Sequence, residues 1–363
     1  MTDFTRRQFL RRAIGGLGAL TIGWFLSACG QEETLVPTVP PLPTSTLVPP
    51  TFTDTPIPTS ASTPTSTLNS TPVPPSAATP TSVPTAPILS GAAYPDLVVA
   101  KGGEPEQLVR RALAAIGGME RFVHNGDDVI IKPNICVAYH PYEYAATTNP
   151  WVVGALVKLC REAGARRVRV MDSPFGGEAK EAYVRSGIQE QVLAAGGEME
   201  IMSRLKFAST DIPQGLDIRK WAIYDDALKA NVLIDVPIAK DHGLARLTLG
   251  MKNLMGLVLN RGDLHANIGQ RLADLTSRIR PTLTVVDAVR ILVRNGPTGG
   301  NLADVKKLDT VIVSPDIVAA DSYAATLFNL QPNELSYIRA ATAMGLGRSD
   351  LRSLRVEEIR VAG

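Results

Sequence analysis

The sequence is poor in cysteine, and this scarcity excludes two classes of metal site. Its 363 residues contain three cysteines, Cys29, Cys136 and Cys160. Three thiols are too few for a four-cysteine iron–sulfur cluster or for a four-thiolate zinc site. Cys160 follows Val152 and Leu156 at helical spacing, so we expect it in the core. A disulfide between Cys136 and Cys160 stays open, because the sequence does not determine the distance between them.

Motifs for common nucleotide and hydrolase chemistry are missing as well. The sequence has no GxGxxG fingerprint, no Walker A lysine motif and no GxSxG nucleophile elbow. Charge of one sign is also scarce, since 37 lysines and arginines face 35 acidic residues, for a net charge of +2. Residues 1–28 hold four arginines and one aspartate, or +3, which leaves −1 for the remainder. This balance argues against a nucleic-acid partner.

The first 28 residues have the pattern of an export signal. TRRQFLRR places Arg6 and Arg7 before an apolar stretch that runs from Ala13 to Ala28 and is short for a membrane span. The stretch ends in LSAC, which resembles a bacterial lipobox with Cys29 as the acylated residue. We therefore predict a twin-arginine signal peptide over 1–28, and a lipid (palmitate) at Cys29 that anchors the protein to the outer face of the cell membrane. The alternatives are an uncleaved N-terminal anchor and Sec export.

Residues 29–91 are predicted to be a disordered stalk. Between Gln31 and Ser90 the sequence is dominated by proline, threonine and serine, and only Glu32, Glu33 and Asp54 carry charge. Such a segment cannot bury enough apolar surface to offset the entropy lost on ordering. Proline keeps it extended, and its threonines and serines are candidates for O-glycosylation.

Residues 92–363 are predicted to form a globular α/β domain, either one large domain or one with a small subdomain. Apolar strands alternate with amphipathic helices along this region, as in a mostly parallel sheet covered by helices on both faces. The main expected strands are 97–100, 128–135, 167–173, 231–239, 282–289 and 310–315, with shorter ones at 198–203 and 220–224. The main expected helices are 104–117, 147–164, 244–259, 264–279, 316–330 and 333–345.

Polar side chains follow the ends of several of these strands. In open α/β sheets, ligands bind outside the carboxyl ends of the strands. The residues at or just after strand ends are Lys132, Asn134, Asp172, Ser173, Lys240, His242, Asp287 and Asp316. We therefore expect them to converge on one rim of the sheet. The alternatives are a lysine that extends to solvent from an edge strand at Lys132 and a helix cap at Asp172.

The stretch KDHGLARLTLGMKNLMG, from Lys240 to Gly256, sets polar groups among apolar neighbours. His242 follows a strand, and Lys252 and Asn253 lie in the expected helix 244–259. Should His242 and His265 meet Asp172 or Asp287, they would form a two-histidine, one-carboxylate metal site. A structural role for a lone histidine is the alternative.

The glycine-rich segment NGPTGGN, residues 295–301, is a candidate anion-binding loop. Its glycines Gly296, Gly299 and Gly300 would let backbone N–H groups approach an oxyanion. The alternative is a flexible turn.

Together these motifs resemble the domain of unknown function 362 family. The resemblance rests on IKPNI, TTNP, VMDSP, the K-x-H…T-x-G-x-K-N-x-x-G pattern, VVDAV, NGPTGG and SPDIVAAD, in this order across 97–347. Some members of that family carry an added ferredoxin-like cysteine cluster, which this chain lacks, so no iron–sulfur chemistry is implied. The matching positions are Lys132, Asn134, Thr148, Asp172, Lys240, His242, Thr248, Lys252, Asn253, His265, Asp287, Gly296, Gly299 and Asp321.

These observations predict an exported, membrane-anchored enzyme with a Lys/His/Asp site for a small anion such as a phosphate or carboxylate. Lys132, Lys240 and Lys252 would form a cationic floor, and a lysine crowded by the others would have a lowered pKa and act as base or nucleophile. His242 would be a general acid/base or a metal ligand, with Asp172 and Asp287 orienting it or holding a divalent metal. Asn134, Asn253, His265 and the glycine loop would bind substrate oxygens. The alternatives are a non-enzymatic lipoprotein that binds an anionic solute and a structural protein whose buried charges neutralise one another.

Overall fold

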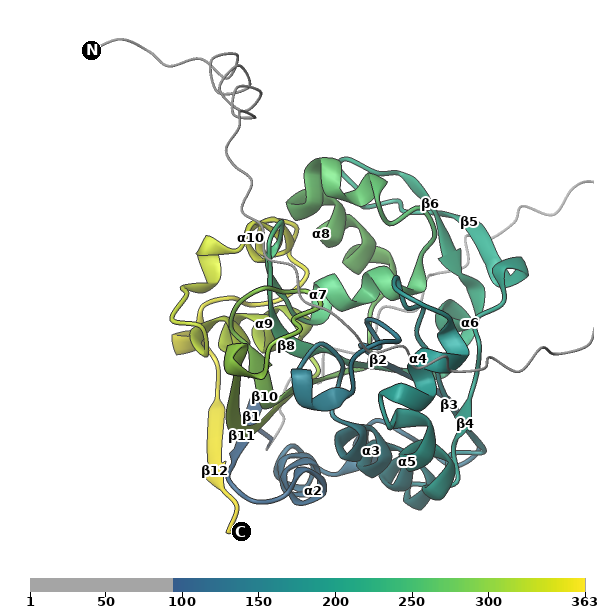
Figure 1. Cartoon of the computed structure of the whole chain (residues 1–363). Coiled ribbons are helices and arrows are strands. Elements are labelled where there is room, and N and C mark those ends of the chain that lie inside the picture. The colour runs from purple at the N-terminus through teal and green to yellow at the C-terminus, as the bar shows by residue number, and fades with distance from the viewer. Residues whose placement is uncertain (1–93, 363) are drawn as a thin grey trace, which may run out of the picture. The chain divides into compact units, whose positions relative to one another are not determined.

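The computed structural model describes residues 94–362, and these residues fold around one central sheet (Figure 1). The predicted signal peptide, Cys29 and the predicted stalk lie outside these residues. The main strands, in their order across the sheet, are β12 (Val356–Arg360), β1 (Leu97–Lys101), β11 (Val305–Ser314), β10 (Leu283–Leu292), β7 (Val232–Val236), β2 (Asp128–Pro133), β3 (Arg167–Val170) and β4 (Glu198–Met199). Two further strands, β8 (Ile238–His242) and β9 (Arg246–Thr248), extend it beside β10.

The predicted α/β class and mostly parallel sheet are confirmed. Neighbours β10, β7, β2, β3 and β4 all run parallel, as do β12 and β1. The antiparallel members are β11, which pairs with both β1 and β10, and β9, which pairs with β8. A separate two-stranded sheet contains β5 (Phe207–Asp211) and β6 (Lys220–Tyr224).

Successive side chains of a strand point to opposite faces of the sheet, and here both faces are apolar. Helices therefore cover both faces, and each face has its own apolar cluster. In β1, Val98 and Ala100 face one cluster, and Leu97 and Val99 face the other. Below the sheet in Figure 1 lie α2 (Pro105–Ala115), α3 (Pro150–Glu162) and α5 (Ile188–Ala194). Helix α4 (Ala179–Arg185) contributes Ala182 and Tyr183 to the same apolar cluster as these helices. The remaining helices are α6 (Asp225–Lys229), α7 (Gly250–Asn253), α8 (Ile268–Arg278), α9 (Ile317–Thr326) and α10 (Ser336–Ala343). Among residues 94–362, no helix is both long and apolar enough to cross a membrane.

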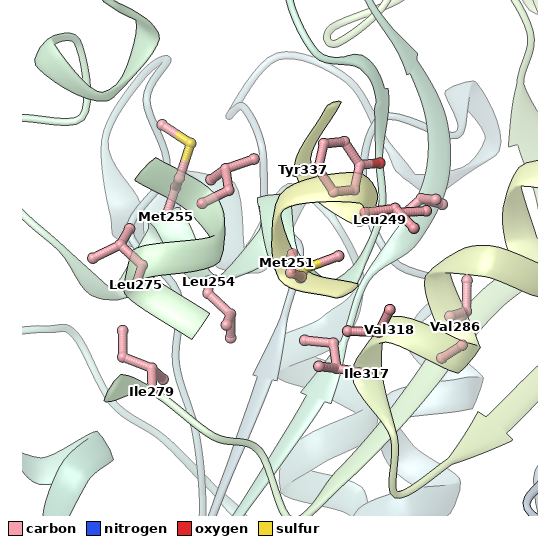
Figure 2. Packing of buried hydrophobic residues seen from close by; sticks show 14 of the residues in the cluster. Leu249, Met251, Leu254, Met255, Leu275, Ile279, Val286, Ile317, Val318 and Tyr337 are labelled. Carbon is pink, nitrogen blue, oxygen red and sulfur yellow. The ribbon is translucent and has the colours of Figure 1, made fainter. Parts of the chain in front are cut away.

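The second cluster holds α7 in the interior. Figure 2 shows Met251 and Leu254 close to Ile317 and Val318 at the start of α9. The carboxylate of Asp321 on α9 accepts hydrogen bonds from the Gly250 and Met251 N–H groups at 2.6 and 3.0 Å. These are backbone donors at the start of α7, which otherwise have no partner inside the helix. The interior face of α9 therefore determines where α7 begins.

Two sequence expectations are wrong in detail. Residues 244–259 do not form one helix: Arg246, at a φ of 64°, closes a hairpin into β9, and α7 is followed by a 3₁₀ turn at Leu254–Leu257. The expected strand 231–239 divides at Pro237 into β7 and β8, because proline has no N–H to donate to a sheet. Helix α3 lies within the expected helix 147–164. It begins at Pro150, and the Asn149 side chain caps it by accepting a hydrogen bond from the Trp151 N–H.

Candidate functional site

The carboxyl ends of the parallel strands β3, β2 and β7, together with β8, carry the polar side chains of one buried cluster. Lys132 comes from β2, Asp172 from the segment after β3, and Lys240 and His242 from β8. Lys252 and Asn253 come from α7. Each of these except Lys252 is at least nine-tenths buried. The structure thus brings together the five residues that were predicted to be catalytic.

Lys132 is fully engaged by protein groups. Its ammonium lies 2.8 Å from Asp172 Oδ1 and donates to Asn253 Oδ1 at 2.8 Å and to the Pro133 carbonyl at 2.9 Å. Asp172 also accepts the Ile135 and Ser173 N–H groups, at 2.6 and 2.8 Å. The ion pair and these hydrogen bonds offset the cost of burying the charge of Lys132. Lys132 lies on an interior strand between β7 and β3, so it does not extend to solvent from an edge strand.

Asn253 links Lys132 and Asn134 to the buried Asp235. Its Oδ1 accepts from Lys132 and from Asn134 Nδ2, and its Nδ2 donates to Asp235 Oδ1 at 2.8 Å. Asp235 is fully buried next to Lys132, and burial raises the pKa of its carboxyl well above the usual range. The predictions did not include Asp235, although an acidic residue in the apolar run VLIDVPIA was an available signal.

Lys240 is saturated by oxygens but has no carboxylate partner. Its ammonium donates to the Ala146 carbonyl at 2.6 Å, to the Pro297 carbonyl at 2.9 Å and to Asn134 Oδ1 at 3.1 Å. Complete burial lowers its pKa. The charge of Lys240 is therefore held by dipoles and is not neutralised by an acid.

Lys252 differs from Lys132 and Lys240 in its contacts. Within the described residues its ammonium makes no hydrogen bond and no ion pair, although the side chain is largely buried. Burial, followed by the charge of Lys240, lowers its pKa to about 8, and Arg261 and Lys132 act in the same direction. A lysine without a hydrogen-bond partner, crowded by cations, has the environment that an activated amine requires, and its use as a base or nucleophile stays a prediction.

His242 is a neutral hydrogen-bond donor. Its Nδ1 lies 3.1 Å from the Leu244 N–H and 3.3 Å from the Ala245 N–H, so this nitrogen accepts and the ring proton is on Nε2. Burial, then the charges of Lys252 and Lys240, lowers the pKa of His242 to about 3. This imidazole therefore stays neutral near pH 7, and its role as a general acid/base stays a prediction. No described residue accepts a hydrogen bond from Nε2.

His265 and Arg261 lie at the outer side of the cluster, where side chains are half-buried. The His265 ring stacks on that of His242, with centroids 6.3 Å apart. Arg261 donates to the carbonyls of Ser173 and Pro174, at 2.6 and 3.2 Å, and forms no ion pair with a described residue. Arg261 was missed by the sequence predictions, because it follows no strand. Cys136 is free and buried beside the Pro297 carbonyl, and Cys160 is also free and buried.

The predicted metal site at Asp172, His242 and Asp287 is not formed. Asp287 accepts the Asn149 and Val289 N–H groups at 2.7 and 2.9 Å, and burial raises its pKa to about 6. Asp172 is paired with Lys132. No group of three or more histidines, cysteines or acidic residues that could hold a metal occurs in residues 94–362.

The glycine loop contributes a carbonyl to the cluster, and its predicted use as an N–H cradle is wrong at two positions. The Gly296 N–H donates to Asp241 Oδ2 and the Gly299 N–H to the Asn295 carbonyl, so neither is free for an anion. A side chain at Gly296 would lie 1.7 Å from the Asp241 carbonyl oxygen, which explains the glycine. Gly300, at a φ of 124°, lies beside the His140 ring.

Comparisons with known proteins place the chain in a family. A thylakoid-associated protein, sll1697, of Synechocystis sp. is 28% identical over 247 residues, which cover 66% of this chain and 74% of that protein. Among solved structures, the lactate racemase apoprotein of Thermoanaerobacterium thermosaccharolyticum is similar at a TM-score of 0.37 and 12% identity, with 59% of this chain covered. This chain spans about half (53%) of that racemase chain. A Thermotoga maritima protein gives a TM-score of 0.34 and 10% identity, covering 62% of this chain and 60% of that one.

The sequence motifs and the strand-end cluster both fall in the region that one family model matches. That model covers residues 129–326, more than half of the chain, and includes Lys132, Asp172, Lys240, His242 and Lys252. The family predicted from the sequence is confirmed. The chain belongs to the family described as domain of unknown function DUF362.

Proposed function

We propose that this protein is an enzyme that binds a small anionic substrate at the carboxyl edge of the sheet and uses Lys252 as its base or nucleophile. One observation carries the proposal: of the three clustered lysines, Lys252 alone has no hydrogen-bond acceptor among the described residues. Burying a charged group without a partner costs free energy, and the fold nevertheless places the Lys252 ammonium in such a position. A substrate group is the partner that would offset that cost.

Local charge supports an anion as the ligand. The charges of Lys240 and Arg261 both act on Lys252, and none of the three side chains pairs with a carboxylate of the described residues. Only Lys132 has such a partner, in Asp172. The excess of positive charge in a poorly solvated site favours a carboxylate or a phosphate.

Export and lipid anchoring are the second part of the proposal. They rest on the order of the signals in the sequence: Arg6 and Arg7, then an apolar stretch, then LSAC ending at Cys29. In this arrangement the enzyme acts outside the cell membrane, held at a distance by the proline-rich residues 29–91.

Ligand-dependent thermal stability tests the anion site. Wild-type protein, Lys252→Met and Lys252→Arg are melted with increasing inorganic phosphate and with a panel of carboxylated and phosphorylated metabolites. A binding anion raises the melting temperature of the wild type by mass action, and Lys252→Met loses this response. Lys229→Met, which changes an exposed lysine paired with Asp225, is the matched control and keeps it.

Turnover then separates an enzyme from a binding protein. Lys252→Arg keeps the positive charge but not an amine of lowered pKa, since arginine remains protonated. An enzyme loses turnover of the bound anion in this variant and retains binding. If no anion stabilises the wild type more than Lys252→Met, the proposal is wrong.

A further inference from the structure

The chemistry available at Lys252 narrows the class of substrate, on the assumption that the proposed anion site is correct. A phosphate alone would use the charge of Lys252 but not its nucleophilic amine. The amine makes no hydrogen bond with a described residue, and burial, followed by the charge of Lys240, lowers its pKa to about 8. A lysine of this kind attacks carbonyl carbon.

His242 supplies the complementary group. Because its Nδ1 accepts the backbone N–H groups of Leu244 and Ala245, its Nε2–H is the free end of the ring. His242 follows Lys240 by two residues on β8, so the two side chains point to the same side of the strand. The charges of Lys252 and Lys240 add to burial in lowering the pKa of His242. A neutral imidazole that donates from Nε2 polarises a carbonyl oxygen without carrying charge.

From this arrangement we propose that the site takes a small 2-oxo acid and that Lys252 forms an imine with its carbonyl carbon. The carboxylate of such a substrate is attracted by the positive charges of Lys240 and Arg261, which no described carboxylate neutralises, and its carbonyl oxygen matches the Nε2–H of His242. A 2-oxo acid joins these two groups on neighbouring carbons, which a simple carboxylate or phosphate does not.

The reaction balances without an oxidant, a reductant or a metal. Lys252 first loses its ammonium proton to solvent water. The Nζ lone pair then forms a bond to the carbonyl carbon while the C=O π electrons move to oxygen. The resulting carbinolamine oxygen leaves as water with the two remaining amine protons, as the C=N bond forms. The other charged or titratable groups that act on Lys252 are Lys132 on β2, Cys136 after β2 and His265 near η5 (Asp263–Asn267).

Borohydride trapping tests the proposal with pyruvate as the probe. The full chain is incubated with pyruvate and sodium borohydride, and the site of the reduced adduct is located by peptide mass spectrometry. We expect one adduct, on Lys252, and none there in Lys252→Arg or Lys252→Met. Below the pKa of about 8, labelling is expected to slow about tenfold per pH unit, following the neutral fraction of the amine.

The role of His242 has its own readout. His242→Gln keeps an acceptor for Leu244 and Ala245 and a donor for the substrate, and is expected to keep most of the trapping rate. His242→Phe removes both the acceptor and the donor and is expected to lower the trapping rate at least tenfold. Lys229→Arg is the control and should leave the trapping rate unchanged. Equal rates in His242→Gln and His242→Phe would overturn the donor role.

The outcomes separate this inference from the proposed function. If pyruvate raises the melting temperature in a Lys252-dependent way but leaves no adduct on Lys252, the imine is ruled out and the anion site stands. Adducts spread over exposed lysines at similar rates also rule it out. If pyruvate neither raises the melting temperature nor labels Lys252, while phosphate raises the melting temperature, the proposed substrate class is wrong. If no anion raises the melting temperature, the proposed function fails as well.

Discussion

Three lysines of one cluster have three different physical states. Lys132 is neutralised by an acid, Lys240 is held by carbonyl and amide oxygens, and Lys252 has no partner among the described residues. Substitution at each position should therefore have a different effect on stability, and the sign of that effect distinguishes a structural lysine from one reserved for a ligand.

Lys132→Met should destabilise the fold strongly. It leaves Asp172 as a buried carboxylate without its cation, and it removes the donor to Asn253. We expect the free energy of unfolding to fall by about 3–5 kcal/mol, as measured by chemical denaturation. The exposed variant Lys229→Met should change it by no more than about 0.5 kcal/mol. A loss of similar size in both variants would contradict the assignment.

Lys252→Met should instead stabilise the protein while abolishing its function. The folded-state pKa of about 8 lies below the usual 10.5, so near and below pH 8 folding confines a charged group at a cost. Removing the charge should raise the free energy of unfolding by about 1–3 kcal/mol near pH 7. As the pH rises from 8 to 10.5 the wild type recovers this difference, because its Lys252 becomes neutral in the folded state first. A gain that does not vary with pH would show that packing of the methionine, and not charge, causes it.

Gly256→Ala tests how closely the turn after α7 approaches the ion pair. A Cβ at Gly256 would lie 2.0 Å from Asp172 Oδ1 and 2.6 Å from Lys132 Nζ. We expect a loss of about 1–3 kcal/mol in the free energy of unfolding, because the pair must move to admit the methyl group. Gly262→Ala is the matched control, since nothing lies within 4 Å of its Cβ position. Equal effects of the two changes would mean that Gly256 does not pack as described.

At the scale of elements, α7 is too short to be stable alone and depends on α9. It has four residues, and the buried Asp321 accepts its first two N–H groups. Burial raises the pKa of Asp321 to about 7, compared with 3.8 for an ordinary aspartate. The contribution of this carboxyl to stability is therefore complete below pH 3.8 and is lost as the pH rises through 7.

Asp321→Asn should remove that part of the pH dependence. Asparagine does not titrate and keeps one acceptor oxygen, so the wild type should lose stability relative to the variant by about 1–3 kcal/mol between about pH 4 and pH 8. The measurement is the free energy of unfolding of both proteins across this range. A constant difference would show that Asp321 does not titrate there.

At the scale of the whole molecule, the proposed location rests on residues before the described domain. Cys29→Ala should abolish incorporation of labelled palmitate and leave the signal segment attached. Cys136→Ala, which changes a cysteine inside the domain, should still be labelled. The measurement is palmitate incorporation together with the mass of the N-terminal peptide. Equal labelling of the Cys29→Ala protein would exclude Cys29 as the lipidated residue.

Much of the fold was predictable because its signals act over short distances. Asn149 and Pro150 determine the start of α3 locally, and the apolar run before Lys240 identifies a buried strand. The helix expected over 244–259 was wrong because Arg246 and the pairing of β9 with β8 override a helical pattern of apolar residues. Asp287 and Gly296 were misassigned because their partners, Asn149 and Asp241, are distant in sequence.

The sequence by itself determined the α/β class, the family and the gathering of polar residues at one edge, because parallel strands bring their carboxyl ends to the same side of a sheet. Only the tertiary structure decided which lysine is free. Lys132 meets Asn253 across 121 residues, and Lys240 meets the Ala146 carbonyl across 94. The charge state of a buried amine depends on such contacts and on the exclusion of water, and neither can be read from its neighbours along the chain.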